Sequence, residues 1–224
     1  MRVVGIIPAR LQSSRLPRKL LLDQTGKSLI QHTWEAASRA ASLSELLVAT
    51  DSLEIADVVR RFGGRAEMTG EHANGTDRVA EAVRRHCGRA DVVVNVQGDE
   101  PEIDPAQIDL LVDTLVQNLA AEMATLSTPI RNRAERDSPS CVKVVCAEDG
   151  RALYFSRAAV PFVRDGDPDE LLSGATPWRL HIGLYAYRRD FLMHLTKAPQ
   201  CTLENLEKLE QLRALEYGVT IQVA

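Results

Sequence analysis

GIIPARLQSSRLPRKLLL, residues 5–22, is the stretch that decides the fold of this chain. It continues an apolar run that predicts a buried strand, and Pro8 stops that strand because it has no N–H to donate to a neighbour. Four cations follow within ten residues: Arg10, Arg15, Arg18 and Lys19. A buried strand that leads into a polar loop at its C-terminal end is typical of the ligand crevice of an open α/β sheet.

The four cations call for anionic partners. A nucleoside triphosphate would supply them, because guanidinium groups bind phosphate through two hydrogen bonds and an ammonium binds it as a point charge. A solvated basic loop that only follows the first strand is the competing interpretation, and this stretch alone leaves both open.

The composition indicates a soluble globular protein. The 224 residues are 45% hydrophobic and 26% charged, and the formal net charge of −4 argues against general nucleic-acid binding. The four cysteines include no C-x-x-C pair, so we expect buried thiols in a reducing compartment rather than a disulfide framework or a zinc site. No signal-type segment or membrane-length apolar run is present, and we expect a cytoplasmic protein with no membrane partner.

Strands and helices alternate up to about residue 120, which predicts right-handed crossovers and a mostly parallel sheet. The expected strands after the first are residues 46–50, 66–68 and 91–96. The expected helices begin behind Ser28 and Asp104 as caps, include the apolar positions of residues 55–62 and 79–87, and in one case end at Gly63.

Beyond residue 120 the pattern changes. We expect strands at residues 123–130, 181–187 and 219–223, and a hairpin that joins 142–146 to 152–155 through Gly150. Residues 161–180 are expected to form a long mobile loop. Thr202 is expected to cap a single final helix that places Leu203, Leu206, Leu209, Leu212 and Leu215 on its core face and is closed by Gly218. The expected architecture is one α/β domain, residues 1–224, with an inserted antiparallel hairpin region.

The second stretch with chemical content is NVQGDEP, residues 95–101. An apolar strand delivers Asp99 to the same sheet edge as the basic loop. A carboxylate beside a triphosphate suits Mg²⁺, which takes oxygen ligands and shares them with phosphates. Gly98 permits close backbone approach, and the amide of Gln97 can both donate to and accept from a base. An ordinary strand-to-helix turn is the competing interpretation, but the pairing with the basic loop favours the metal site.

Six separated motifs carry a resemblance that runs from Val3 to Val223. They are IIPAR-x4-RLP-x-K, HxNGTDR, VNVQGDEP, ALYFSRA-x-VP, HIGLYAYRR and LEKLEQLRALEYG. In this order they resemble the 3-deoxy-manno-octulosonate cytidylyltransferase family, the CMP-Kdo synthetases, where Kdo is the eight-carbon sugar acid. The resemblance implies a Rossmann-like nucleotide-diphospho-sugar transferase fold and transfer of CMP from CTP to Kdo for lipopolysaccharide biosynthesis. It also implies a homodimer formed through the hairpin region.

The resemblance also implies roles for individual residues. Arg10, Arg15 and Lys19 would hold the triphosphate and neutralise the departing pyrophosphate, and Asp99 would bind Mg²⁺. The residues implied to recognise cytidine are Asn74, Gly75, Thr76 and Gln97. The residues implied to bind the sugar acid are Arg157 at its carboxylate and His181, Tyr185, Glu210 and Gln211 at its hydroxyls. Residues 1–120 would then form the CTP-binding half, and 121–224 the sugar-binding and dimerisation half.

Several of these positions have a simpler interpretation. Asn74 and Gly75 could form only a tight turn, and Asn74 stands where the family usually has Ser. His181 could be a hydrogen-bonded edge residue. Glu204, Glu207 and Glu210 read by themselves as a solvated acidic face.

The substrate and the end of the chain leave alternatives open. The sugar could be 8-amino-Kdo or another acidic sugar such as a sialic acid. The family pattern continues with G-V-D-T-P-E-D-L, whose Asp is a second metal ligand, whereas the printed sequence ends at Ala224. We therefore expect a truncated sequence, a second carboxylate from elsewhere, or a protein that binds CTP without turning it over.

Overall fold

The computed structural model describes residues 1–12 and 16–224. The chain divides into two compact units. Unit 1 comprises Met1–Asp113 and Leu184–Lys197, and unit 2 comprises Thr114–Gly183 and Ala198–Ala224. Helix α4 (Pro105–Gln117) and strand β8 (Arg179–Arg188) each contribute residues to both units.

Unit 1 contains a sheet with the strand order β3-β2-β1-β4-β8. Its other strands are β1 (Val3–Ala9), β2 (Glu45–Thr50), β3 (Ala66–Met68) and β4 (Val92–Asn95). Strand β1 pairs in parallel with β2 and β4, β2 pairs in parallel with β3, and β8 runs antiparallel to β4. The predicted mixed α/β fold with a mostly parallel sheet is confirmed.

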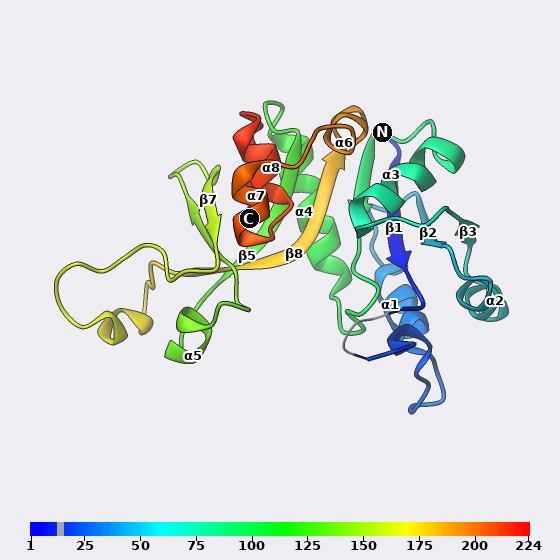
Figure 1. Ribbon diagram of the computed structural model, residues 1–224, viewed down its shortest axis with the longest axis horizontal. Helices are drawn as coiled ribbons and strands as arrows, with labels where there is room; N and C mark the ends of the chain where they lie inside the picture. Colours follow the sequence, from blue (N-terminus) through cyan, green and yellow to red (C-terminus); the bar gives the residue numbers. More distant parts are fainter. Residues whose placement is uncertain (13–15) are drawn as a thin grey trace. The chain divides into compact units, whose positions relative to one another are not determined.

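The helices of unit 1 follow the strands as the alternation predicts (Figure 1). They are the 3-10 helix η1 (Lys19–Leu21), α1 (Leu29–Ala37), α2 (Leu53–Arg61), α3 (Gly75–His86), the first part of α4, and α6 (Arg189–Leu195). Gly63, at φ 85°, ends α2 in the left-handed conformation that its sequence position predicts. Asp104 Oδ1 accepts a hydrogen bond from the Ala106 N–H at 2.9 Å, whereas the Ser28 hydroxyl makes no capping bond to α1.

The core of unit 1 lies on β1 and β4. Ile6 and Ile7 of β1, and Val93 and Val94 of β4, are all fully buried, as continuous apolar runs in parallel strands require. A Cβ atom added to Gly5 would lie 2.8 Å from a Leu46 methyl carbon and 2.9 Å from a Leu43 methyl carbon, so this glycine makes room for the two leucine side chains. The apolar runs therefore bury the strands and leave their C-terminal ends to carry polar side chains.

Unit 2 combines a parallel strand pair with an antiparallel hairpin. Strands β5 (Met123–Pro129) and β9 (Ile221–Val223) pair in parallel. Strands β6 (Lys143–Cys146) and β7 (Ala152–Ser156) form the predicted hairpin, with Gly150 at φ 80° in its turn. The first residues of β8 pair antiparallel with β6.

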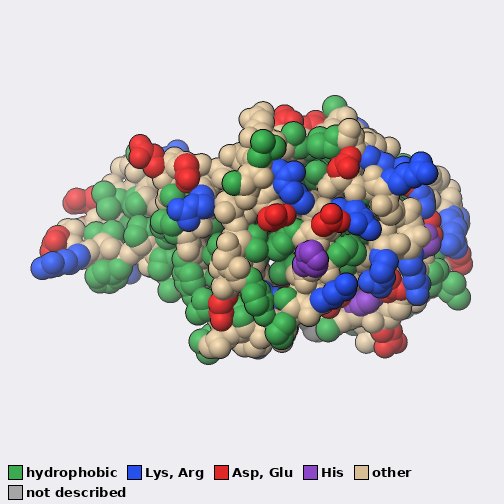
Figure 2. Space-filling view, turned by 90° about the horizontal axis from the view of Figure 1, so that it is seen from above, with side chains coloured by type: hydrophobic (Ala, Val, Ile, Leu, Met, Phe, Trp, Pro, Cys, Tyr) green, Lys and Arg blue, Asp and Glu red, His purple; other side chains and the backbone are tan. Residues whose placement is uncertain are grey.

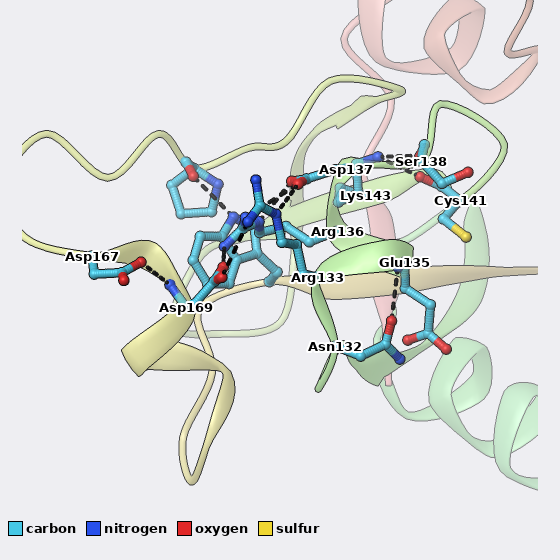
Figure 3. A network of polar contacts seen from close by, with 12 residues as sticks. Asn132, Arg133, Glu135, Arg136, Asp137, Ser138, Cys141, Lys143, Asp167 and Asp169 are labelled. Atoms are coloured by element: carbon cyan, nitrogen blue, oxygen red, sulfur yellow. Dashed lines mark hydrogen bonds and ion pairs between the residues drawn. The ribbon is translucent and has the colours of Figure 1, made fainter.

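The long loop of unit 2, residues 161–180, is held by an ion pair, a cation–π contact and a hydrogen bond (Figures 1 and 3). It contains a 3-10 helix, η2 (Pro168–Leu172), and it packs near α5 (Arg133–Asp137), neither of which the sequence predicted. Buried Arg136 of α5 pairs with Asp169 at 2.8 Å and lies 5.1 Å from the ring centroid of Trp178. The indole N–H of Trp178 donates to the Pro161 carbonyl at 3.0 Å. The loop is therefore held at its two ends and its middle.

The leucine spacing predicted a single final helix, and this prediction is wrong. Two short helices are present, α7 (Thr202–Glu207) and α8 (Gln211–Glu216), and Lys208 between them takes a left-handed conformation at φ 53°. The break rotates the leucine stripe, so Leu206 is 76% exposed while Leu212 is fully buried. The Cys201 sulfur, rather than Thr202, accepts from the N–H of Glu204 and caps α7.

The surface carries both signs of charge. On the face shown in Figure 2, Lys and Arg side chains lie next to Asp and Glu side chains. The exposed ion pairs of the chain include Lys27 with Glu35 at 2.6 Å. Within the residues that the structure describes, none of the helices has the length and apolar character needed to span a membrane.

Candidate active site

Two glycines and a proline bring three motifs of unit 1 together. A Cβ atom added to Gly75, at the start of α3, would lie 3.4 Å from the Pro8 ring, and one added to Gly98 would lie 3.3 Å from the Pro8 carbonyl oxygen. The C-terminal ends of β1 and β4 and the N-terminus of α3 therefore meet at Pro8. This is the sheet edge at which the sequence placed the ligand.

Lys19 and Asp99 join the basic loop to the turn after β4. The Lys19 ammonium donates to Asp99 Oδ2 at 2.8 Å, and the two side chains are 38% and 45% exposed. An ion pair this exposed contributes little to stability, at most about 1 kcal/mol. Its more important property is that a cation and a carboxylate lie together at an accessible edge, where a ligand can reach both.

The other cations of the loop differ in their surroundings. Arg10 is exposed directly after β1, whereas Arg18 takes a left-handed conformation at φ 58° and pairs with Glu54 of α2. Arg15 lies outside the described residues, and its predicted role stays a prediction.

Asn74 caps helix α3 and forms no tight turn. Its Oδ1 accepts from the Asp77 N–H at 2.8 Å, and its Nδ2 donates to Asp77 Oδ2 at 2.9 Å. Both ends of the Asn74 amide are therefore used by the helix. Thr76 is buried in the first turn, and Gln97 lies half-buried beyond the end of β4.

In unit 2, backbone carbonyl groups hold the guanidinium of Arg157. Its Nε donates to the Glu207 carbonyl at 2.6 Å and its Nη1 donates to the Pro139 carbonyl at 2.9 Å. Within the described part of the chain, no carboxylate forms an ion pair with it. Neutral carbonyls fix the orientation of this cation and leave its charge for an anionic ligand.

Glu207 is a residue that the sequence missed. Its carboxylate accepts from the Ser156 hydroxyl at 2.7 Å and from the Arg157 N–H at 3.0 Å. Glu204 is 3% exposed and binds Arg213 through two hydrogen bonds of 2.8 and 2.7 Å. The interpretation of these glutamates as a solvated face is therefore wrong for both.

Lys143 holds the backbone carbonyl of Arg157. This lysine is fully buried, and its ammonium donates to the carbonyl of Arg157 at 2.7 Å. It also donates to the carbonyls of Ser138 and Cys141 at 2.9 and 2.5 Å (Figure 3). Burial lowers the pKa of Lys143. A buried charge is costly unless hydrogen bonds satisfy it, so three carbonyls indicate a position built to fix the chain at Arg157.

The remaining predicted sugar-binding residues lie on β8 and α8. His181 contacts the Thr125 hydroxyl at 3.0 Å and meets the Phe155 ring edge-on, and burial lowers its pKa to about 4. Tyr185 belongs to the part of β8 in unit 1 and lies opposite Asn95 of β4. Glu210 precedes α8, and Gln211, 3% exposed, begins it.

The comparisons with known proteins agree with one another. A family model described as cytidylyltransferase matches residues 4–221. A 3-deoxy-manno-octulosonate cytidylyltransferase of Rhodopirellula baltica is 49% identical over 100% of this chain and 90% of its own length. Another, from Geobacter sulfurreducens, is 50% identical with the same two coverages. The chain belongs to the 3-deoxy-manno-octulosonate cytidylyltransferase family.

Structures with the same fold extend this family comparison. A CMP:2-keto-3-deoxy-manno-octonic acid synthetase complexed with CTP aligns with a TM-score of 0.92 and 40% identity, over 100% of this chain and 89% of its own. A 4-diphosphocytidyl-2C-methyl-D-erythritol synthase from Anaerococcus prevotii aligns over 100% of this chain and 86% of its own, with a TM-score of 0.61 and 12% identity, and shows the fold alone. The chain thus shares its fold with a protein of low sequence identity.

The described residues of this cytidylyltransferase could bind Mg²⁺ only if a bound nucleotide supplied further oxygen ligands. Among the described residues, no three His, Cys, Asp or Glu side chains form a group that could hold a metal ion. Asp99 offers carboxylate oxygens of the type that Mg²⁺ prefers, and Lys19 already donates to one of them. Mg²⁺ at this edge would therefore take Asp99 together with phosphate oxygens and water.

Proposed function

We propose that this chain transfers CMP from CTP to Kdo and releases pyrophosphate. Support comes from relatives of 49–50% identity that cover the whole chain and from the CTP-complexed relative at a TM-score of 0.92. The observation that carries the proposal is the Lys19–Asp99 ion pair, which joins the two motifs expected to bind the triphosphate.

In this proposal the basic loop acts on the leaving group. Arg10, Arg15 and Lys19 hold the β- and γ-phosphates, and their fixed positive charges stabilise the pyrophosphate as its negative charge develops. Lys19 leaves Asp99 for the triphosphate when the nucleotide binds. That exchange costs little because the pair is exposed.

Asp99 is the proposed ligand of Mg²⁺. When bound, the ion polarises the α-phosphate and lowers the pKa of the attacking sugar hydroxyl. Asp99 would supply the protein oxygen to the ion, and phosphate oxygens and water would supply the others.

Cytidine recognition is proposed for Gln97 together with Asn74, Gly75 and Thr76. The side-chain amide of Gln97 can donate to one edge group of a pyrimidine and accept from another. Because the amide of Asn74 caps α3, Asn74 contributes through the backbone that it positions.

The carboxylate of the sugar acid is proposed to bind Arg157, whose planar fork matches a carboxylate. His181, Tyr185, Glu210 and Gln211 form the hydrogen bonds to its hydroxyls. His181 is neutral at physiological pH because its pKa is about 4, so it contacts a hydroxyl rather than an anion.

A second substrate has one specific observation in its favour. An 8-amino-3,8-dideoxy-manno-octulosonate cytidylyltransferase of Shewanella pealeana is 47% identical over 100% of this chain and 90% of its own length. Arg157 recognises the carboxylate that both sugars share, and so does not distinguish their far ends. We also propose a cytoplasmic homodimer that serves lipopolysaccharide synthesis, and light scattering tests the oligomeric state.

The test is pyrophosphate release with CTP, Mg²⁺ and a panel of Kdo, 8-amino-Kdo and a sialic acid. We expect the highest kcat/KM with Kdo. A preference for 8-amino-Kdo would replace the substrate but keep the reaction. CTP binding without pyrophosphate release on any of the three sugars would contradict the proposal.

A further inference from the structure

The loop between β3 and α3, residues 69–74, is held by two buried charges of opposite sign on α3. Arg78 is 3% exposed and Glu81 is 5% exposed. Burial of a charged side chain is costly unless it is paired and hydrogen-bonded, so the partners of these two residues indicate what they hold.

Arg78 holds the start of the loop and the end of β2. Its Nη1 donates to the Thr69 hydroxyl at 2.6 Å and to the Gly70 carbonyl at 3.3 Å, and its Nη2 donates to Asp51 Oδ2 at 2.6 Å. Asp51 follows β2 directly. One planar guanidinium therefore connects the loop to the C-terminal edge of the sheet.

Glu81 holds the same peptide from its other side. Its Oε2 accepts from the Gly70 N–H at 3.0 Å and from His72 Nε2, and its Oε1 pairs with Arg85 at 2.8 Å. Burial by itself would raise the pKa of Glu81, but the hydrogen bonds from His72 and Gly70 and the charge of Arg85 lower it overall. Glu81 is therefore an ionised acceptor, and His72 donates to it.

His72, Arg78 and Glu81 together form a clamp on residues 69–72. This clamp lies next in sequence to Asn74, Gly75 and Thr76, which are proposed to recognise the base. His72 lies two residues before Asn74, and the Asn74 amide is committed to capping α3. The loop is thus fixed at Thr69, Gly70 and His72 on one side and at the helix cap on the other. The contacts of His72 therefore lie two residues from the backbone at Asn74 and three residues from Gly75.

We propose that His72, Arg78 and Glu81 are positioning residues that fix the backbone of residues 69–75 and so set the preference for cytosine over uracil. This inference rests on the proposed cytidine-binding role of Asn74, Gly75 and Thr76. The sequence gives His72 no role, because its spacing from the Cys, Asp and Glu residues does not suit a metal site. Its contact with the Glu81 carboxylate is the observation that gives it one.

His72→Ala and His72→Gln form the informative pair. A Gln amide can still donate to Glu81, whereas Ala cannot. His72 has a side chain that is 22% exposed, and thermal melts check that both variants fold. Arg78→Lys is a second variant, because an ammonium keeps the charge but loses the planar fork. Arg84→Gln, on an exposed position of the same helix, is the control.

The measurements are Kd for CTP and for UTP by calorimetry, and KM and kcat with Kdo. For His72→Ala and Arg78→Lys we expect Kd and KM for CTP to rise about tenfold, with a smaller change for UTP and little change in kcat or in the KM for Kdo. We expect His72→Gln to recover most of the CTP affinity and Arg84→Gln to match wild type.

An unchanged ratio of CTP to UTP affinity in folded His72→Ala, or no recovery in His72→Gln, would overturn the proposed role. A wild-type chain that prefers CTP in calorimetry but releases no pyrophosphate would contradict the proposed function while the calorimetric comparison still tests the clamp.

Discussion

At the scale of single residues, the charged side chains of the candidate site are bound to other groups of the protein. A ligand can replace some of these groups and can bind beside others. Lys19 and Asp99 pair with each other in an exposed position, and the Arg157 guanidinium is oriented by neutral carbonyls. In the proposed mechanism Lys19 exchanges Asp99 for the triphosphate. Arg157 keeps its carbonyl partners and binds an anion as well. Each arrangement leads to a different result on substitution.

Asp99→Asn should keep the fold and lower turnover about 100-fold, because a neutral amide is a poor ligand for Mg²⁺. Steady-state pyrophosphate release across a Mg²⁺ titration measures this, with a thermal melt as the control for folding. Turnover within about threefold of wild type would remove Asp99 from the metal site.

Arg157→Lys should raise the KM for Kdo about tenfold, since an ammonium cannot match a carboxylate at two points. The KM for CTP should stay near the wild-type value. If the KM for CTP rises instead, Arg157 belongs to the nucleotide site.

His181 predicts a pH dependence of stability. Its pKa is about 4 in the folded chain and 6.5 as the ordinary value, so between these pH values the unfolded chain binds a proton that the folded chain does not. Stability from this residue is therefore present above pH 6.5 and falls as the pH drops toward 4, by about 2 kcal/mol at pH 5. Urea denaturation of wild type and His181→Gln at pH 7 and 5 measures the difference, and equal losses in both would contradict the assignment.

At the scale of elements, the break between α7 and α8 builds the Arg157 site. Lys208 in the left-handed conformation ends α7, and the carbonyl of Glu207 beside it accepts from Arg157. A continuous helix would use that carbonyl in its own hydrogen bonds. The buried Glu204–Arg213 pair then joins the two short helices across the break.

Lys208→Gly should stabilise the protein by about 0.5–1 kcal/mol, because glycine adopts a positive φ without strain. Lys208→Val should destabilise it by about 1–2 kcal/mol. Arg84→Gly, inside α3, is the matched control and should cost about 1 kcal/mol. Chemical denaturation gives all three values, and destabilisation by Lys208→Gly would contradict the left-handed assignment.

The sequence predicted the elements whose signals are local. Apolar runs located β1, β2 and β4, and Gly63 located the end of α2. The break at Lys208 could not be predicted, because lysine has no preference for a positive φ and the leucine spacing continues through it. The sequence predicted an exposed Glu204 because its partner, Arg213, lies nine residues further along the chain. The two side chains come together only because the chain breaks between α7 and α8. The sequence also predicted that Lys19 and Asp99 lie at the same sheet edge, because parallel strands end at one edge. It did not predict the ion pair between them.

At the scale of the whole molecule, the two units divide the proposed chemistry. Unit 1 carries the proposed nucleotide residues, and unit 2 carries Arg157, His181, Glu210 and Gln211. Strand β8 carries His181 in one unit and Tyr185 in the other.

This division predicts independent effects on binding. Lys19→Gln should raise the Kd for Mg-CTP about tenfold, because it removes a charge-assisted contact to phosphate. Arg157→Lys should leave that Kd unchanged, since the two residues belong to different units. Calorimetric titration of both variants with CTP and no sugar measures this, and equal losses of affinity would contradict the division.

The transfer of CMP itself is tested most directly by ³¹P NMR of the chain with CTP, Mg²⁺ and Kdo. We expect the α-phosphate signal of CTP to become a phosphodiester signal, with one pyrophosphate formed for each CTP consumed and no change when Kdo is omitted. Formation of CDP and inorganic phosphate, or persistence of CTP that calorimetry shows to be bound, would contradict it.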